Sequence, residues 1–182
     1  SGFVDGTGVR IITVRPNAVN PEPAQQPGGV ERRAPSGSTT LPAAAIVDRL
    51  ESEGAAVSID DARVIVAGGR GTGGEQGFEL VEEIAGLLGG AVGATRAAVD
   101  SGWIPYAQQI GQTGKIVKPR LYLAMGISGA IQHKVGMQTS ETIIAVNRDP
   151  DAPIAEFADM LVVGDLFEVG RALVTELKAR KG

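Results

Sequence analysis

Short apolar runs alternate with amphipathic segments from residue 61 to the C-terminus. A continuous run of Val, Ile, Leu and Ala is typical of a strand that is buried on both faces of a sheet, whereas an apolar stripe at every third or fourth residue predicts a helix. The predicted strands are residues 63–67, 91–93, 108–112, 121–125, 142–146 and 160–163. The predicted helices are residues 74–88, 96–99, 154–158 and 165–181, with one more that begins within residues 129–134. This alternation predicts an α/β fold with a doubly wound parallel sheet.

The first 60 residues follow a different pattern. Residues 9–14 predict one strand, and residues 41–53 a short helix with Thr40 as its N-cap. Between them lie five of the ten prolines, which neither a sheet ladder nor a helix interior accepts. We therefore expect residues 1–60 to be the tail of a preceding domain plus a Pro-rich N-terminal arm, and residues 61–182 to form one domain.

Composition narrows the possible chemistry. The chain has no Cys and one His, which argues against thiolate or His-rich metal sites, so we expect no metal. A net charge of −4 without a basic patch argues against nucleic acid. No apolar run reaches the roughly 18 residues of a membrane span, and no secretory signal is present. These features predict a cytoplasmic protein without membrane insertion.

Glycine is the most informative residue type. Of 26 glycines, 16 fall between Gly68 and Gly136, mostly where predicted strands end. Gly69, Gly71 and Gly74 match the G-x-G-x-x-G pattern of a dinucleotide-binding turn between a strand and a helix. An NAD site would also need an acidic residue about 20 positions later, yet Thr95-Arg96 stands there. A tight turn without a ligand is the alternative for these glycines.

The other strand ends also carry polar groups. Ser128 lies in MGISG, and Gln112 and Thr113 lie between two glycines in GQTG. Asn147 follows a strand, and Asp165 begins the last helix, where capping alone would explain it. Because ligands bind beyond the carboxyl ends of parallel strands, this convergence favours an elongated, phosphate-bearing ligand such as a dinucleotide.

Several segments then carry a specific resemblance. VAGGRG, GATRAAVDSGW, QIGQTGK, MGISGAIQH and IIAVNRDPDAPI occur in the order and spacing of the electron transfer flavoprotein alpha subunit. The chain resembles the C-terminal FAD-binding domain of that family over roughly residues 62–177. The resemblance implies a Rossmann-like, DHS-like NAD/FAD-binding fold, non-covalent FAD, and an electron transfer flavoprotein beta subunit as partner in a heterodimer.

The resemblance also implies roles for individual residues. Arg70, Thr95 and Ser128 would contact the FAD pyrophosphate, and Arg96 would stabilise the anionic, one-electron-reduced ring. Thr113 would hydrogen-bond the N5 edge of the flavin, and His133 would face the carbonyl end of the ring and help stabilise negative charge on the reduced flavin. The remaining residues expected at the cofactor are Ile110, Gly111 and Gln112 along the ring, Gly129, Ala130, Ile131 and Gln132 in GISGAIQH, and Asn147, Asp165 and Leu166 at the adenosine end.

The family implies an electron carrier rather than an enzyme with a substrate of its own. FAD would take electrons from dehydrogenases, such as the acyl-CoA dehydrogenases of fatty acid beta-oxidation, and pass them to a quinone reductase or another acceptor. Two alternatives stay open at this point: an NAD-dependent enzyme of similar fold, and a nucleotide-binding regulatory module without redox chemistry. Cofactor identity discriminates among the three.

Overall fold

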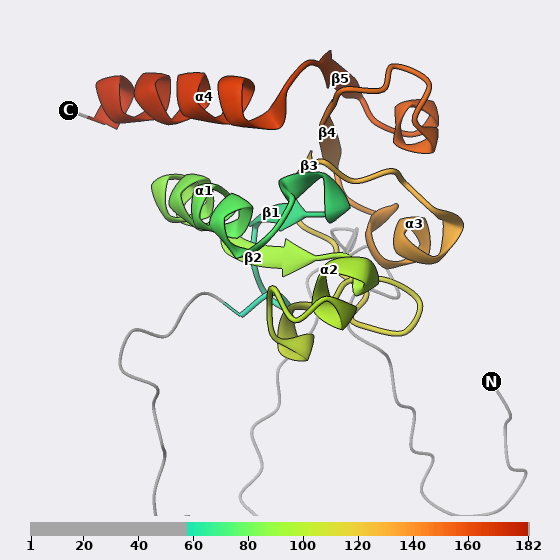
Figure 1. Cartoon of the computed structure of the whole chain (residues 1–182). Coiled ribbons are helices and arrows are strands. Elements are labelled where there is room, and N and C mark those ends of the chain that lie inside the picture. The colour runs from blue at the N-terminus through green and yellow to red at the C-terminus, as the bar shows by residue number, and fades with distance from the viewer. Residues whose placement is uncertain (1–57, 182) are drawn as a thin grey trace, which may run out of the picture. The chain divides into compact units, whose positions relative to one another are not determined.

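The computed structural model describes residues 58–181, which contain one five-stranded sheet. All pairings are parallel, and the strand order is β2-β1-β3-β4-β5 (Figure 1). The strands are β1 (Val64–Gly68), β2 (Ala91–Ala94), β3 (Leu121–Met125), β4 (Thr142–Asn147) and β5 (Met160–Val163). The predicted parallel sheet is confirmed.

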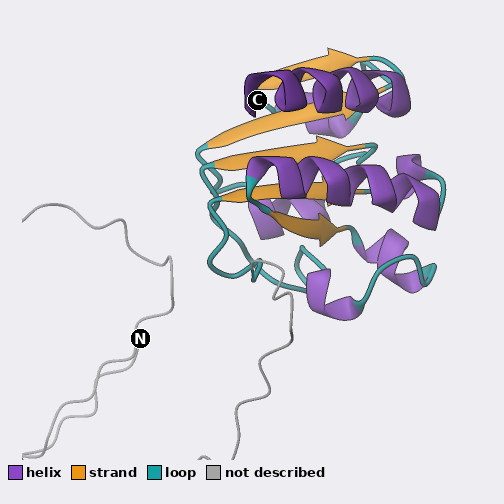
Figure 2. Cartoon of the chain, turned by 90° about the vertical axis from the view of Figure 1, so that its left-hand side faces the viewer, coloured by secondary structure: helices purple, strands orange, loops and turns teal. Residues whose placement is uncertain are grey.

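Helices cover both faces of this sheet. Figure 2 shows two long helices, α1 (Glu75–Leu88) and α4 (Leu166–Lys181), across one face, with the strand arrowheads pointing to the same side. The opposite face packs against α3 (Ile131–Met137) and the 3-10 turn η3 (Pro153–Glu156). The other short elements are η1 (Arg70–Thr72), α2 (Arg96–Asp100) and η2 (Tyr106–Gln108). The sheet is therefore doubly wound, as the pattern predicts.

The strand sequences explain the two-sided burial. Side chains alternate between faces along a strand, so Ile65 and Ala67 of β1 belong to one core cluster and Val66 to the other. All three are fully buried. The α4 residue Val174 and the α1 residue Ile84 pack in the second cluster. A strand that is apolar at every position is thus required by a sheet with helices on both sides.

Two predicted elements differ in the structure. Residues 108–112 are not a strand: Gln108 ends η2, and the following residues form a loop with single bridges at Gln109 and Ile110. Gly111, at φ +140°, takes the backbone out of the β region, which ends the pairing. Residues 154–158 form only the 3-10 turn η3. Helix α3 begins at Ile131, within the predicted range, after Gly129 turns the chain at a φ of +88°.

The predicted strand at residues 9–14, the Pro-rich arm and the helix at residues 41–53 lie outside the described residues. Within residues 58–181, no helix is both long enough and apolar enough to cross a membrane.

The strand order places a reversal of direction between β1 and β3. From β1 the chain passes through α1 to β2 on one side, and then returns to β3 on the other side of β1. Helix α1, which follows β1, packs on one face of the sheet, and helix α3, which follows β3, packs on the other, so a crevice is expected between the two connections. Ligands of open parallel sheets bind at such a point.

Candidate functional site

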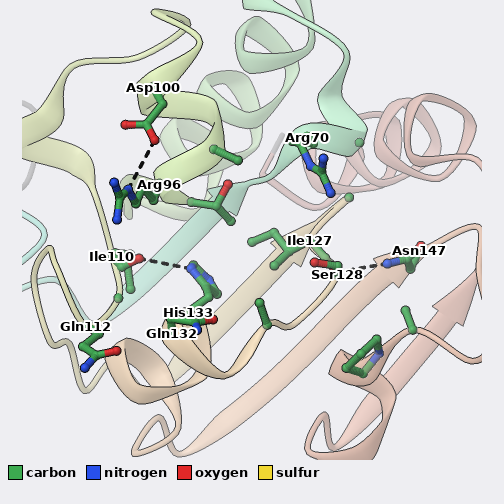
Figure 3. Close-up of a pocket in the computed structure, with 18 of the residues that line it drawn as sticks. Arg70, Arg96, Asp100, Ile110, Gln112, Ile127, Ser128, Gln132, His133 and Asn147 are labelled. Carbon is green, nitrogen blue, oxygen red and sulfur yellow. Dashed lines mark hydrogen bonds and ion pairs between the residues drawn. The ribbon is translucent and has the colours of Figure 1, made fainter.

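A cavity of about 820 Å³ opens at this edge of the sheet. Its size is that of a cofactor-binding cleft. Residues from the ends of β1, β2, β3 and β4 and from the loop before β3 surround it (Figure 3). The lining residues are Arg70, Gly71, Thr95, Arg96, Ala97, Asp100, Ile110, Gly111, Gln112, Thr113, Gly126, Ile127, Ser128, Ala130, Gln132, His133, Asn147, Asp149, Ala152 and Pro153.

The segments after β1 and β3 touch at two glycines. The Gly69 N–H donates to the Met125 carbonyl at 3.0 Å, and the Gly71 N–H donates to the Gly126 carbonyl at 2.9 Å. A Cβ at Gly71 would lie 2.6 Å from the Gly126 Cα, so only glycine allows this approach. The amides of Gly69 and Gly71 are thus used within the protein, and in this turn the glycines serve close packing of two strand ends.

The segment after β3 keeps its amides available. Among residues 58–181, the N–H groups of Ser128, Gly129 and Ala130 have no acceptor. Arg70 lies across the cavity with an exposed side chain, and its guanidinium makes no ion pair with any described residue. Free amides together with a free guanidinium suit a phosphate group.

Thr95 and Arg96 begin helix α2 beside the cavity. The Thr95 carbonyl accepts from the N–H groups of Ala98 and Val99, so its backbone occupies the N-cap position. Its hydroxyl makes no capping bond, and Oγ1 is buried without a hydrogen-bond partner. The Arg96 Nε lies 3.2 Å from the Asp100 carboxylate one turn later (Figure 3). A buried hydroxyl without a partner costs free energy unless a ligand completes it.

The loop between η2 and β3 supplies neutral polar groups. The Gly114 N–H donates to the Gly111 carbonyl at 3.0 Å, and this turn presents the exposed side chains of Gln112 and Thr113 to the cavity. Ile110 is buried beside them and adds an apolar surface. This combination matches the edge and face of a neutral ring.

His133 lines the cavity but is almost fully buried, at 6% exposure. Its Nδ1 lies 3.1 Å from the Ile110 carbonyl, which only accepts, so Nδ1 carries the proton. Nε2 then accepts from the Tyr122 hydroxyl at 2.9 Å. Burial lowers the pKa of His133 to about 4, the bond to Ile110 opposing this only in part. Any role of His133 toward a ligand at neutral pH therefore falls to an uncharged imidazole.

The residues expected at the adenosine end hold the protein's own backbone. The Asn147 Nδ2 donates to the Ile127 carbonyl at 2.9 Å, and its Oδ1 accepts from the Asp149 N–H (Figure 3). Asp165 caps α4 by accepting from two amides and also pairs with Arg148. That pair, with the caps, lowers the pKa of Asp165. The predicted cap of the last helix is confirmed.

Leu166 lies at a second, smaller hollow of about 100 Å³. This hollow shares Gly71, Gly126 and Asn147 with the main cavity, so the two are adjacent. Gly129, Ile131 and Asp165 line neither hollow. In Gly129, a φ of +88° and close contact with Ile154 indicate a structural turn.

The fold brings together most of the predicted site residues. Those that line the main cavity are Arg70, Thr95, Arg96, Ile110, Gly111, Gln112, Thr113, Ser128, Ala130, Gln132, His133 and Asn147. Gly71 of the G-x-G-x-x-G pattern also lines the cavity, whereas sequence reasoning missed the neighbours Ala97, Asp100, Gly126, Ile127, Asp149, Ala152 and Pro153. Only Asp100 had a usable signal, since it lies four residues after Arg96 on one helix face.

Comparison with known proteins agrees with this geometry. Residues 58–138 match the family model described as the electron transfer flavoprotein FAD-binding domain. The chain is 53% identical, over 94% of its length, to "Electron transfer flavoprotein subunit alpha" of Mycobacterium leprae, and 57% identical, over 69% of its length, to that of Thermoanaerobacterium thermosaccharolyticum. It is also 51% identical, over 73% of its length, to "Protein FixB" of Clostridium saccharobutylicum.

The chain spans 54%, 38% and 40% of these three relatives, about half of their length or less. The family match ends at residue 138, directly after α3, and the relatives extend the similarity beyond it. The cavity's free amides, its free guanidinium and the buried hydroxyl of Thr95 fit a phosphate-bearing cofactor such as FAD. Residues 58–138 therefore belong to the family of electron transfer flavoprotein FAD-binding domains.

Proposed function

We propose that this chain binds FAD in the main cavity and acts as an electron carrier, as the alpha-subunit part of an electron transfer flavoprotein. One observation carries the proposal: the ends of four parallel strands, in a chain that matches an FAD-binding family, form a single cavity at the β1/β3 reversal. FAD supplies reversible one- and two-electron chemistry when bound. The domain to which we assign FAD binding is residues 61–182.

The charged and the neutral residues of the cavity would bind different parts of the cofactor. Arg70 and the amides of Ser128 to Ala130 would hold the pyrophosphate, and the Thr95 hydroxyl would complete its hydrogen bonding there. Gln112, Thr113 and the backbone of Ile110 and Gly111 would hold the edge of the ring. Arg96 places a positive charge on the same wall, where it would favour a negatively charged ring.

At the adenosine end, these residues would shape the site rather than form side-chain hydrogen bonds with the cofactor. Asn147 and Asp165 are engaged in holding the segments after β3, β4 and β5, so they would shape the second hollow where Leu166 lies. His133 would contribute a neutral wall to the cavity. Among residues 58–181, both ring nitrogens of His133 are engaged by Tyr122 and the Ile110 carbonyl rather than by a serine or threonine hydroxyl, so we propose a carrier rather than an enzyme.

Partners follow from the proposed role as an electron carrier. We propose an electron transfer flavoprotein beta subunit as the structural partner, dehydrogenases as electron donors, a quinone reductase as acceptor, and the cytoplasm as location. The relatives named electron transfer flavoprotein subunit alpha support this proposal.

Titration of the chain with FAD, with and without a beta subunit, tests the proposal. We expect the visible flavin spectrum to follow the protein after desalting, and Arg70→Ala to weaken FAD binding about tenfold by removing the free guanidinium. Arg63→Ala is the matched control, because Arg63 is also an exposed arginine but precedes β1 at the opposite edge of the sheet. Absence of FAD binding even with the beta subunit, or tighter binding of NAD, would overturn the proposal.

A further inference from the structure

Gln109 is a buried polar residue beneath the loop that faces the cavity. Its side chain is 2% exposed, and with Thr72 and His133 it makes up the buried polar residues of the described part of the chain. The backbone holds it from both sides: its N–H donates to the Tyr106 carbonyl at 2.9 Å, and its carbonyl accepts from the Lys115 N–H at 2.8 Å. Its side chain is thus fixed relative to the loop above it.

The side chain of Gln109 contacts a single cavity residue. Its Nε2 donates to the Thr113 Oγ1 at 3.0 Å. The Thr113 carbonyl in turn accepts from the Tyr106 hydroxyl at 2.8 Å. Gly114 closes the loop so tightly that a Cβ there would lie 2.4 Å from the Gln109 carbonyl oxygen. The hydroxyl and the backbone of Thr113 are therefore both held by groups outside the cavity.

The direction of the Gln109 bond decides what Thr113 can offer a ligand. A hydroxyl has one proton to donate, and an amide NH₂ group only donates. Since Gln109 donates to Oγ1, the hydroxyl proton of Thr113 is left for an acceptor elsewhere, and the exposed side of Thr113 faces the cavity. We propose that Gln109 is a positioning residue that makes the Thr113 hydroxyl a hydrogen-bond donor toward the cofactor.

This inference rests on the proposed function, because it takes the cofactor to be FAD with Thr113 at the N5 edge of the flavin. N5 of the oxidised flavin is an unprotonated nitrogen that accepts a hydrogen bond, whereas 5-deaza-FAD carries a C–H group in its place. A donating Thr113 therefore distinguishes the two cofactors. Gln109→Glu presents a carboxylate that only accepts, so it draws the Thr113 proton to itself and turns a lone pair toward the cofactor.

The experiment measures dissociation constants of FAD and 5-deaza-FAD for the full chain at pH 8 by calorimetry. We expect the unchanged chain to bind FAD about fivefold more tightly than 5-deaza-FAD, the value of one hydrogen bond. Gln109→Glu is expected to abolish this preference and to change the affinity for 5-deaza-FAD less than about twofold. Gln138→Glu makes the same charge change at an exposed residue after α3 and should keep the preference.

A second variant keeps the test decisive if a buried carboxylate prevents folding. Gln109→Met preserves the volume but donates nothing, and it should reduce the preference at least twofold. In a Thr113→Val background, neither change at Gln109 should alter the ratio, which a merely structural role would not predict.

The outcomes separate the two proposals. If the unchanged chain binds neither cofactor even with a beta subunit, the proposed function fails and this inference fails with it. If the unchanged chain binds both cofactors equally, FAD binding stands but Thr113 is no donor to N5. If Gln109→Glu or Gln109→Met retains the fivefold preference, the assignment of Gln109 is overturned.

Discussion

Acidification tests the buried imidazole of His133 directly. In the folded chain the Nδ1–H donates to Ile110 and Nε2 accepts from Tyr122, so the ring is neutral. A second proton would have to enter at Nε2, which faces the hydroxyl that now donates to it. The Tyr122 hydroxyl is fully buried and would need to turn and find another acceptor in the core.

The size of the effect follows from the two pKa values. Burial lowers the pKa of His133 from 6.5 to about 4 in the folded chain. Between these values the unfolded chain binds more protons than the folded chain, so stability is highest above pH 6.5 and falls as the pH is lowered. At about 1.4 kcal/mol per pKa unit, the loss is about 2 kcal/mol between pH 7 and pH 5.

A single resonance reports the titration. His133 is the only histidine of the chain, so one imidazole Cε1–H signal in the proton NMR spectrum belongs to it without assignment. We expect its midpoint near pH 4. Urea unfolding at pH 7 and pH 5 should show that the unchanged chain loses about 2 kcal/mol more than His133→Asn, in which no imidazole titrates. A midpoint at or above pH 6.5 would refute the buried, neutral histidine.

Three further predictions follow from the contacts of the site and its scaffold. Arg96→Ala should lower the first reduction potential of bound FAD by a few tens of millivolts in spectroelectrochemistry, because an exposed positive charge on the cavity wall is lost. An unchanged potential would show that Arg96 does not act on the ring. Gly71→Ala should abolish FAD binding by separating the ends of β1 and β3, whereas Gly86→Ala, which meets no atom within 4 Å, should stabilise α1 by about 0.5–1 kcal/mol in urea unfolding. Asp165→Ala should lower the melting temperature by removing the cap of α4 and its pair with Arg148. Asp165→Asn should restore the share of the melting temperature that is due to the cap, so equal melting temperatures of the two variants would contradict the capping role.

The strands could be predicted because the residue types of each strand reflect how its side chains are buried. The apolar runs of β3 and β5 end at the predicted residues. In the central strand β3, this follows because a strand covered on both faces has few positions for polar side chains. Residues 108–112 contain a single large apolar residue, Ile110, between Gln109 and Gly111, and Gly111 turns the backbone before a ladder can form. The local sequence shows which side chains a strand could carry, but it does not show whether a neighbouring strand is in position to pair with them.

The site was predictable at the level of segments. Polar residues after strands gather at one edge because parallel strands end there, and this requires only the strand assignment. The partners of those residues were not predictable. Tyr122 lies in the apolar run of β3, and yet its hydroxyl donates to His133. Gln109 lies in the predicted strand that does not form, and yet its side chain donates to Thr113. Both contacts join residues whose neighbourhood is created by the fold.

These hidden partners separate polar residues that build the cavity from those that remain available to a ligand. Hydrogen bonds within the protein engage the side chains of the first kind: they join carbonyls, amides or a buried hydroxyl to Asn147, Asp165 and His133. Arg70 and the Thr95 hydroxyl have no partner among residues 58–181. Replacing a residue of the first kind perturbs the shape of the site, so it should reduce stability and affinity together. Replacing one of the second kind should reduce affinity while stability stays unchanged for the exposed Arg70 and stays unchanged or rises for Thr95, because an unpartnered buried hydroxyl is removed.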